Sequence, residues 1–198
     1  MTSHELGDKR PPPVLTTQRL TVRLATYRDA AAIAHYYQEN RAFLQSYEPT
    51  RSPRFYTPAF WQVQVEQNRL QFEQDLALRL FLFEHSAPTL VIGVVNFTQF
   101  FREPFHACLL GYSLAQTKQR QGLMQEALEV AIDYLFHDLN FHRVMANYMP
   151  RNQRSGNLLR RLGFVIEGYA RDYLQINGKW EDHVLTSRTN PKWHSSTI

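Results

Sequence analysis

A glycine stands at the point where a β-rich run passes through a short polar segment into a helical pattern. The run is Ala107 to Ala115, the glycine is Gly122, and apolar residues recur at helical spacing from Leu123 onward. The first turn of a helix carries unpaired backbone N–H groups and a partial positive charge, and glycine allows a ligand to approach the backbone closely. Residues 119–124 therefore predict a pyrophosphate site, with an ordinary capping loop as the alternative.

A second segment places polar residues at the start of another helical pattern. This helix is expected from about Arg154 to Leu162, and Gly163 follows it, where a left-handed C-terminal cap is usual. Asn152 and Ser155 lie at its beginning. Each of them can cap the helix or offer a hydrogen bond to a ligand, and both interpretations stay open.

These two segments resemble the GCN5-related N-acetyltransferase superfamily. Its signature is Gln or Arg, two residues, Gly, one residue, then Gly or Ala; Gln119 and Gly122 match it, whereas Met124 departs from the usual small residue. The post-strand helix that ends in Gly-Phe matches as well. The resemblance covers Leu15 to Thr189 and implies an α/β fold of mixed α+β character. Its central mixed, mostly antiparallel sheet is splayed between two parallel strands and has helices on both faces.

Further segments are similar to the ribosomal-protein N-acetyltransferases of this superfamily, and closer to the alanine-directed than to the serine-directed members. They are Arg41 to Pro49, Gly93 to Phe97, Phe105 to Tyr112, Met145 to Pro150 and Gly168 to His183. The resemblance implies that acetyl-coenzyme A is the cosubstrate. It also implies that the acceptor is the N-terminal α-amine of a ribosomal protein, alanine in the first instance, which attacks the thioester directly.

The resemblance assigns the coenzyme to one set of residues. The backbone near Tyr112 and Leu114 would bind the pantetheine arm and help to stabilise the oxyanion, and the turn before Leu123 would hold the phosphates. The full set is Tyr112, Leu114, Gln119, Arg120, Gln121, Gly122, Leu123, Met124 and Asn152.

The residue that donates a proton to the leaving thiolate cannot be assigned from the usual position in the superfamily. Many members of the superfamily use a tyrosine four residues before the Gly-Phe glycine, but this chain has Leu159 there. The resemblance to the ribosomal acetyltransferases implies Ser155, one turn earlier, as the catalytic acid, and a purely capping role is the alternative.

The general base must also come from another position. Some relatives carry a strand glutamate where this chain has Leu109. The resemblance to N-terminal acetyltransferases, which often use a carboxylate from the loop between the first two helices, implies Glu48 as the base, with a solvated loop carboxylate as the alternative. Tyr47 and His106 are weaker candidates for lining the same cleft. An α-amine, with a pKa near 8, is about a tenth neutral at pH 7, whereas a lysine amine is almost entirely charged, so an α-amine demands less of a base.

Two other functions are compatible with the pattern. Acetylation of a small amine, such as a polyamine or an aminoglycoside, would require an acid-rich pocket, but Arg41, Arg51 and Arg54 surround Glu48. Those arginines favour an acidic peptide or a ribosomal surface. A non-catalytic module that binds the ribosome through a basic, aromatic surface is the remaining alternative.

The elements that position these residues can be read from periodicity and turn signals. Thr26 with Asp29 resembles a capping box, Thr57-Pro58 should begin a helix, Glu84 to Pro88 should form a longer hairpin loop, and Asn177-Gly178 a tight one. The expected strands are Leu20 to Leu24, Leu78 to Phe83, Leu90 to Phe97, Ala107 to Ala115, Arg143 to Met149, Phe164 to Ile176 and Trp180 to Ser187. The expected helices run from Thr26 to Tyr37, from Pro58 to about Asp75, from Leu123 onward and from about Arg154 to Leu162.

Composition sets the outer bounds. With 198 residues, 43% of them hydrophobic, we expect one domain at 15–189, a disordered lead at 1–14 and a tail at 190–198. The net charge of +4 suits an anionic ligand but not direct DNA binding. The single cysteine, Cys108, is expected to be buried and inert. Without a signal-peptide pattern, a membrane-spanning run or metal-ligand spacing, we expect a cytoplasmic protein with no metal.

Overall fold

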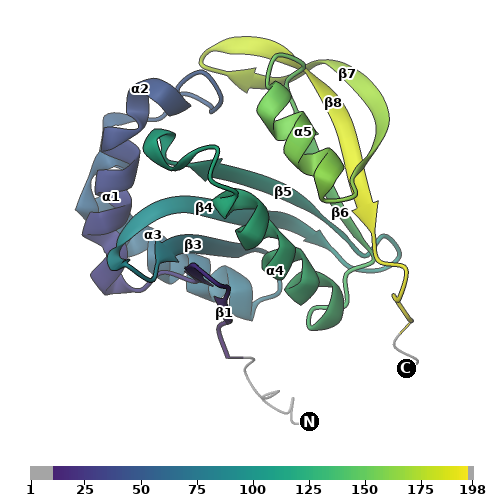
Figure 1. Cartoon of the computed structure of the whole chain (residues 1–198), viewed down its shortest axis with the longest axis horizontal. Coiled ribbons are helices and arrows are strands. Elements are labelled where there is room, and N and C mark those ends of the chain that lie inside the picture. The colour runs from purple at the N-terminus through teal and green to yellow at the C-terminus, as the bar shows by residue number, and fades with distance from the viewer. Residues whose placement is uncertain (1–10, 196–198) are drawn as a thin grey trace, which may run out of the picture.

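The structure, a computed structural model, describes residues 11–195 and is built on one twisted eight-stranded sheet (Figure 1). The strand order is β1-β2-β3-β4-β5-β6-β8-β7, and every neighbouring pair is antiparallel except β5 and β6. The strands are β1 (Val14–Thr16), β2 (Leu20–Arg23), β3 (Leu78–Glu84), β4 (Ala87–Phe101), β5 (Ala107–Leu114), β6 (Arg143–Tyr148), β7 (Val165–Ile176) and β8 (Lys179–Thr189). This arrangement confirms the expected fold class.

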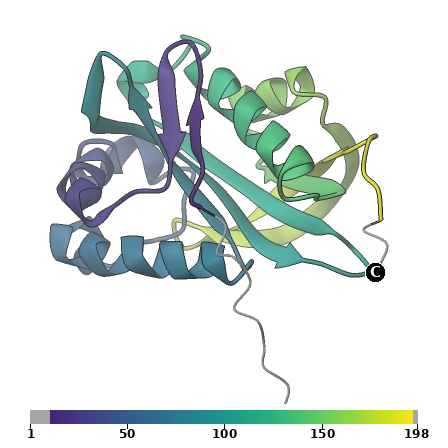
Figure 2. The ribbon, with the colours of Figure 1, turned by 90° about the horizontal axis from the view of Figure 1, so that it is seen from below.

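Helices cover both faces of the sheet, and Figure 2 shows α1 and α3 on one side with α4 and α5 on the other. The helices are α1 (Ala30–Glu39), α2 (Arg41–Leu44), α3 (Pro58–Glu73), α4 (Leu123–His137) and α5 (Gln153–Arg161). Strand β3 explains the two layers, since its successive side chains alternate between faces. Leu80 and Leu82 belong to the core under α4, whereas Phe81 and Phe83 belong to the core under α1 and α3.

The one parallel pair of strands separates soon after it begins. Strands β5 and β6 pair only at Ala107 with Arg143, Cys108 with Val144 and Leu109 with Met145. Beyond that point β5 continues to Leu114 and β6 to Tyr148 without pairing with each other. A wedge therefore opens between the carboxyl ends of the two strands.

Local turn and cap chemistry is where the sequence predictions are most accurate. The capping box of Thr26 with Asp29 is present, and the Thr57 hydroxyl accepts the Phe60 N–H ahead of α3. Asn177 and Gly178 both adopt positive φ, 45° and 78°, as a tight hairpin turn of this type requires.

Two predictions about the first half of the sheet are wrong. Glu84 pairs directly with Ala87, so the connection between β3 and β4 is a two-residue turn and not the longer loop to Pro88. Strand β1 was also missed, because three residues at the sheet edge are too short to show alternation.

The ends of the chain extend the sheet on one side and pack against it on the other. Residues 1–10 of the expected lead lie outside the described residues, and Val14 already belongs to β1. After β8, the buried Asn190 side chain donates to the carbonyls of Phe136 and Phe141, and the Trp193 indole donates to the Asn140 carbonyl. The first part of the expected tail is thus packed onto the domain. Cys108 is fully buried, and burial raises the pKa of its thiol.

The Asp29 carboxylate, just before α1, is paired with Arg23, and this pairing predicts a pH-dependent contribution to stability. Arg23 donates from both Nη atoms to Asp29, at 2.8 and 2.9 Å, and the Thr26 N–H donates at 2.7 Å. Burial acts to raise the pKa of Asp29, but these hydrogen bonds outweigh it and hold the pKa below its usual value. The ionised form is therefore stabilised by folding.

We expect Asp29→Asn to lower the free energy of unfolding at pH 7 by about 1–3 kcal/mol, as lost charge-assisted hydrogen bonds do. Because the folded pKa is depressed, this contribution is present above the unfolded pKa and disappears as the pH falls through the folded one. Denaturant titrations between pH 7 and pH 3 measure it. The exposed Asp133→Asn is the control, and an equal loss at both ends of the pH range would contradict the assignment.

Candidate active site

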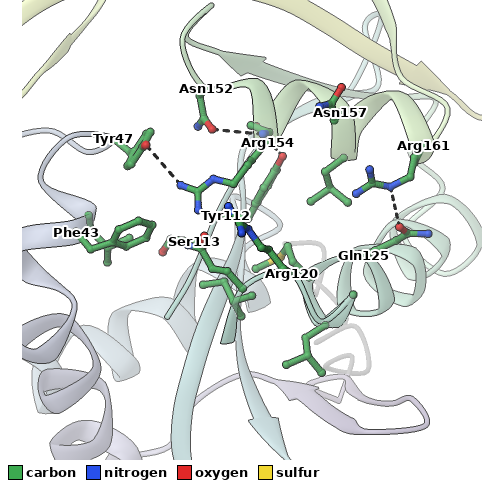
Figure 3. A pocket seen from close by; sticks show the side chains of 18 residues that line it. Phe43, Tyr47, Tyr112, Ser113, Arg120, Gln125, Asn152, Arg154, Asn157 and Arg161 are labelled. Carbon is green, nitrogen blue, oxygen red and sulfur yellow. Dashed lines mark hydrogen bonds between the residues drawn. The ribbon is translucent and has the colours of Figure 1, made fainter. Parts of the chain in front are cut away.

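A cavity of about 320 Å³ occupies the wedge where β5 and β6 diverge (Figure 3). Four parts of the chain form its wall: the α2 region, the end of β5, the turn into α4 with its first residues, and one face of α5 along its whole length. All of the residues expected to bind the coenzyme line this cavity except Gln121. The Gln121 side chain instead donates to the Thr117 carbonyl at 3.1 Å.

The turn into α4 has the backbone shape that the glycine predicted. Gly122 is the N-cap of α4 with φ 77°, and Arg120 also adopts a positive φ of 61°. The amide groups of the first helical turn have no partner within the helix, and Gly122, Leu123 and Met124 line the cavity. Arg120 and Arg161 add positive charge to the same wall. This cradle fits a diphosphate group.

The start of α5 separates the roles of Asn152 and Ser155. The Asn152 side chain accepts the Ser155 N–H at 3.3 Å and is therefore the helix cap. The Ser155 hydroxyl is not used for capping and instead lies 2.7 Å from the Tyr112 hydroxyl. Burial raises the pKa of Tyr112 to about 12, so its hydroxyl carries a proton at neutral pH. The Ser155 hydroxyl therefore does not cap the helix, and its role as the catalytic acid stays a prediction.

Glu48 lies next to the main cavity but outside its wall. It lines a smaller neighbouring pocket of about 60 Å³ that shares Leu44 with the main one. Burial raises the pKa of Glu48, while Arg51, with Nη2 3.7 Å from the carboxylate, and the Ser113 hydroxyl act in the lowering direction. Glu48 is largely enclosed by protein, so it is not a solvated loop carboxylate.

Ser113 connects the two pockets. Its side chain belongs to the wall of the main cavity, interacts with the Glu48 carboxylate, and shares a 3.0 Å hydrogen bond with the Tyr36 hydroxyl. Ser113, which follows Tyr112 on β5, was not among the site residues predicted from the sequence. Its position in the wall follows from the separation of β5 from β6, which no local pattern reveals.

The two weaker candidates have different outcomes. Tyr47 lines the cavity, and the Arg154 side chain reaches it, with Nη2 3.5 Å from the hydroxyl and the guanidinium 5.3 Å from the Phe43 ring centre (Figure 3). His106 lies at the other end of β5 against Trp193, with ring centres 5.0 Å apart, and the expectation that it lines the cleft is wrong.

Arginines of α5 form part of the site that the sequence analysis missed. Arg154, Leu158 and Arg161 all line the cavity and are spaced by four and three residues, so they share one helix face. That spacing was the available signal. Phe43 carried none, because α2 has only a single turn.

A family comparison agrees with this geometry. The sequence model described as an acetyltransferase (GNAT) domain matches residues 19–165. The chain belongs to the GCN5-related N-acetyltransferase superfamily. It is thus an acetyltransferase, and the cosubstrate of its family is acetyl-coenzyme A.

Individual relatives narrow the placement of this GNAT acetyltransferase. The [ribosomal protein uS5]-alanine N-acetyltransferase of Escherichia coli (strain K12) is 50% identical over 179 residues, which cover 90% of this chain and 92% of that protein. The probable N-acetyltransferase YjcK of Bacillus subtilis (strain 168) is 33% identical over 90% of this chain and 98% of its own. The crystal structure of the ribosomal-protein-S5-alanine acetyltransferase from Vibrio fischeri superposes with a TM-score of 0.88 at 41% identity, covering 92% of this chain and 99% of that one. The expected resemblance to the alanine-directed members is confirmed.

Within residues 11–195, no three His, Cys, Asp or Glu side chains come together as a potential metal site. Over the same range, no helix combines the length and the apolar character that crossing a membrane requires.

The placement of α5 against β6 gives a prediction about this site. A Cβ atom at Gly156 would lie 2.7 Å from two atoms of the Tyr148 ring, closer than real contacts allow. We therefore expect Gly156→Ala to destabilise the enzyme by about 1–3 kcal/mol, despite the better helix propensity of alanine.

Thermal unfolding measures this effect, and Gly111→Ala on β5 is the matched control, since nothing lies within 4 Å of the Cβ position there. Replacing the ring in the double variant Gly156→Ala/Tyr148→Leu should recover part of the loss. Equal behaviour of the two alanine variants would mean that α5 does not depend on this close approach.

Proposed function

We propose that this acetyltransferase modifies the N-terminal α-amine of a ribosomal protein that begins with alanine, and that it acts in the cytoplasm. The observation that carries the proposal is the 50% identity, over 90% of the chain, to an enzyme named for that reaction on uS5. The cavity supports it with a cradle for the coenzyme and an adjoining enclosed carboxylate.

Acetyl-coenzyme A would lie along the wedge between β5 and β6. Beyond Leu109 the β6 side of β5 has no strand partner, so backbone groups near Tyr112 and Leu114 are free to pair with the amides of the pantetheine arm. The diphosphate would lie at the turn 119–124. Backbone N–H groups beside the thioester would stabilise the oxyanion that forms when the amine attacks.

The departing thiolate needs a proton, and the hydroxyl pair of α5 and β5 can supply it. The Ser155 hydroxyl donates to the sulfur as the carbon–sulfur bond breaks, which releases coenzyme A as a thiol. The Tyr112 hydroxyl, 2.7 Å away, holds the serine in place and passes its own proton to the serine oxygen. The proton that Glu48 takes from the amine then returns to Tyr112 through solvent, so that the enzyme ends the cycle unchanged.

The attacking amine must lose a proton, and Glu48 is the proposed acceptor. Glu48 does not line the cavity itself, whereas Ser113 does and also interacts with the carboxylate. The proton of the attacking nitrogen passes to the Ser113 oxygen as the Ser113 proton passes to Glu48. Because an α-amine is partly neutral at pH 7, a weakly basic carboxylate is sufficient.

The charges around the cavity disfavour a polycationic small molecule as acceptor. Its wall contains Arg120, Arg154 and Arg161, and none of the described residues that line it is an aspartate or a glutamate. A peptide terminus, which carries one positive charge and then a polar backbone, meets less repulsion than a polyamine would. The same arginines suit an acidic surface next to the peptide.

Substrate choice is tested with short peptides whose first residues are Ala, Ser or a lysine with a blocked α-amine. We expect α-acetylation of the alanine peptide, with kcat/KM about tenfold or more above that of the serine peptide, and no reaction at the lysine side chain. Mass spectrometry identifies one added acetyl group and its position. Acetylation of the blocked lysine peptide, or of spermidine, at a comparable rate would overturn the proposal.

The role of Glu48 is tested by Glu48→Gln. We expect kcat/KM for the alanine peptide to fall by about 100-fold, the scale of general-base catalysis. Because burial raises the pKa of Glu48, the wild-type enzyme should lose activity with falling pH through two ionisations, that of the amine and that of Glu48. The variant should retain only the ionisation of the amine.

The exposed Glu39→Gln, on the adjacent helix α1, is the control for the loss of one carboxylate. An unchanged rate and an unchanged pH profile in Glu48→Gln would remove Glu48 from the mechanism without affecting the proposed substrate.

A further inference from the structure

The hairpin between β1 and β2 lies against the turn that forms the coenzyme cradle. Arg19 of this hairpin donates from Nη1 to the Gln121 carbonyl at 2.9 Å and from Nε to the Glu126 carboxylate at 2.8 Å. Its Nη2 lies 2.6 Å from the same carboxylate. One guanidinium therefore joins the cradle turn to the first turn of α4, although neither Arg19 nor Glu126 lines the cavity.

The position of Arg19 is itself fixed by several hydrogen bonds. Its backbone N–H donates to Glu126 at 2.8 Å, and its carbonyl accepts the His85 N–H from the turn between β3 and β4 at 3.0 Å. The Thr17 hydroxyl also donates to Glu126. The guanidinium thus extends from a backbone that is tied to the sheet, and can hold the turn in register with it.

The bond to the Gln121 carbonyl determines the direction of the following amide. In a trans peptide the carbonyl and the next N–H point to opposite sides. With the Gln121 carbonyl held toward Arg19, the Gly122 N–H points away from Arg19, and Gly122 forms part of the cavity wall. Arg120, which is not a glycine, has a positive φ of 61°, so contacts from outside the turn help to keep its shape.

The guanidinium also compensates a charge of the wrong sign for phosphate binding. Glu126 lies in the first turn of α4, next to the cradle. Burial acts to raise its pKa, but hydrogen bonds from Thr17 and Arg19 outweigh this and lower the pKa, so the carboxylate is ionised at neutral pH. Unpaired, it would repel a diphosphate at the same helix end.

From this geometry we infer that Arg19 is a positioning residue for the coenzyme diphosphate, which orients the Gly122 amide and neutralises Glu126. The inference rests on the proposed location of the diphosphate at residues 119–124. It concerns binding of the nucleotide end of the coenzyme and not the chemistry at the thioester.

Arg19→Met removes the guanidinium and keeps most of the aliphatic stem. Since the Arg19 side chain is 45% exposed, its ion pair contributes little to folding, and the melting temperature should change little. We expect the calorimetric Kd for coenzyme A to rise about tenfold or more, and the KM for acetyl-coenzyme A with it, while kcat is retained. The rate with S-acetylpantetheine, which lacks the diphosphate, should be unchanged.

Three further variants make the result decisive. Arg28→Met removes one exposed positive charge elsewhere and should leave the Kd for coenzyme A unchanged. Arg19→Lys keeps a positive charge beside Glu126, but its ammonium cannot bind Glu126 and the Gln121 carbonyl at the same time as a planar guanidinium does. It should therefore give an intermediate Kd for coenzyme A. This variant remains informative even if Arg19→Met folds poorly. Gly122→Asp puts a side chain at φ 77°, with its Cβ 3.5 Å from Arg19 Nη2, and should distort the turn and abolish coenzyme A binding if the diphosphate lies there.

The outcomes distinguish the location of the diphosphate from the role of Arg19. Retained coenzyme A affinity in Gly122→Asp would overturn the location of the diphosphate and the role of Arg19 with it. Loss in Gly122→Asp combined with a Kd within about twofold of wild type in Arg19→Met would overturn the role of Arg19 alone. Equal losses with acetyl-coenzyme A and S-acetylpantetheine would assign Arg19 to general folding.

Discussion

The early end of pairing between β5 and β6 is the constraint on which the rest of the site depends. Three residue pairs join the two strands, and then their backbones separate. Backbone polar groups inside a protein need partners, so an unpaired strand edge in the middle of a sheet is unfavourable unless a ligand or solvent satisfies it. In the wedge, backbone N–H and C=O groups of the two strands are therefore available to hydrogen-bond a bound molecule.

Both helices that follow the diverging strands begin at this wedge. The chain leaves β5, turns at Gly122 and enters α4; it leaves β6, is capped by Asn152 and enters α5. Each helix thus directs its N-terminal amides and the positive end of its dipole toward the same cavity. The arginines on α5 and in the turn strengthen the effect, and the absence of carboxylates from the described part of the wall leaves it uncompensated.

The acceptor side is built differently, from contacts between segments far apart in the sequence. The Asn177 N–H donates to the Glu48 carbonyl at 3.1 Å, so the tip of the β7–β8 hairpin rests against the segment that carries the proposed base. Arg154 approaches the same segment from α5 through Tyr47. Glu48 lines the small pocket at this junction together with Asn177, and burial is the first cause of its raised pKa.

Features with local causes could be predicted from the sequence, and features with distant causes could not. The turn at Asn177-Gly178, the cap at Thr57 and the cradle at residues 119–124 each follow from a few neighbouring residues. The pairing of Tyr112 with Ser155 joins residues 43 apart, and that of Arg19 with Glu126 joins residues 107 apart, so no window of sequence contains either interaction. The choice between capping and chemistry at Ser155 was undecided for the same reason.

The cradle at the start of α4 would contact a part of the coenzyme that the reaction does not alter. If the phosphates lie there, the same amides hold both acetyl-coenzyme A and the product coenzyme A. Only the part of the cavity that receives the acetyl group then distinguishes the two. Product would then compete with substrate for the free enzyme at similar strength. The rate of modification would then depend on the ratio of acetyl-coenzyme A to free coenzyme A, as well as on the total amount of either.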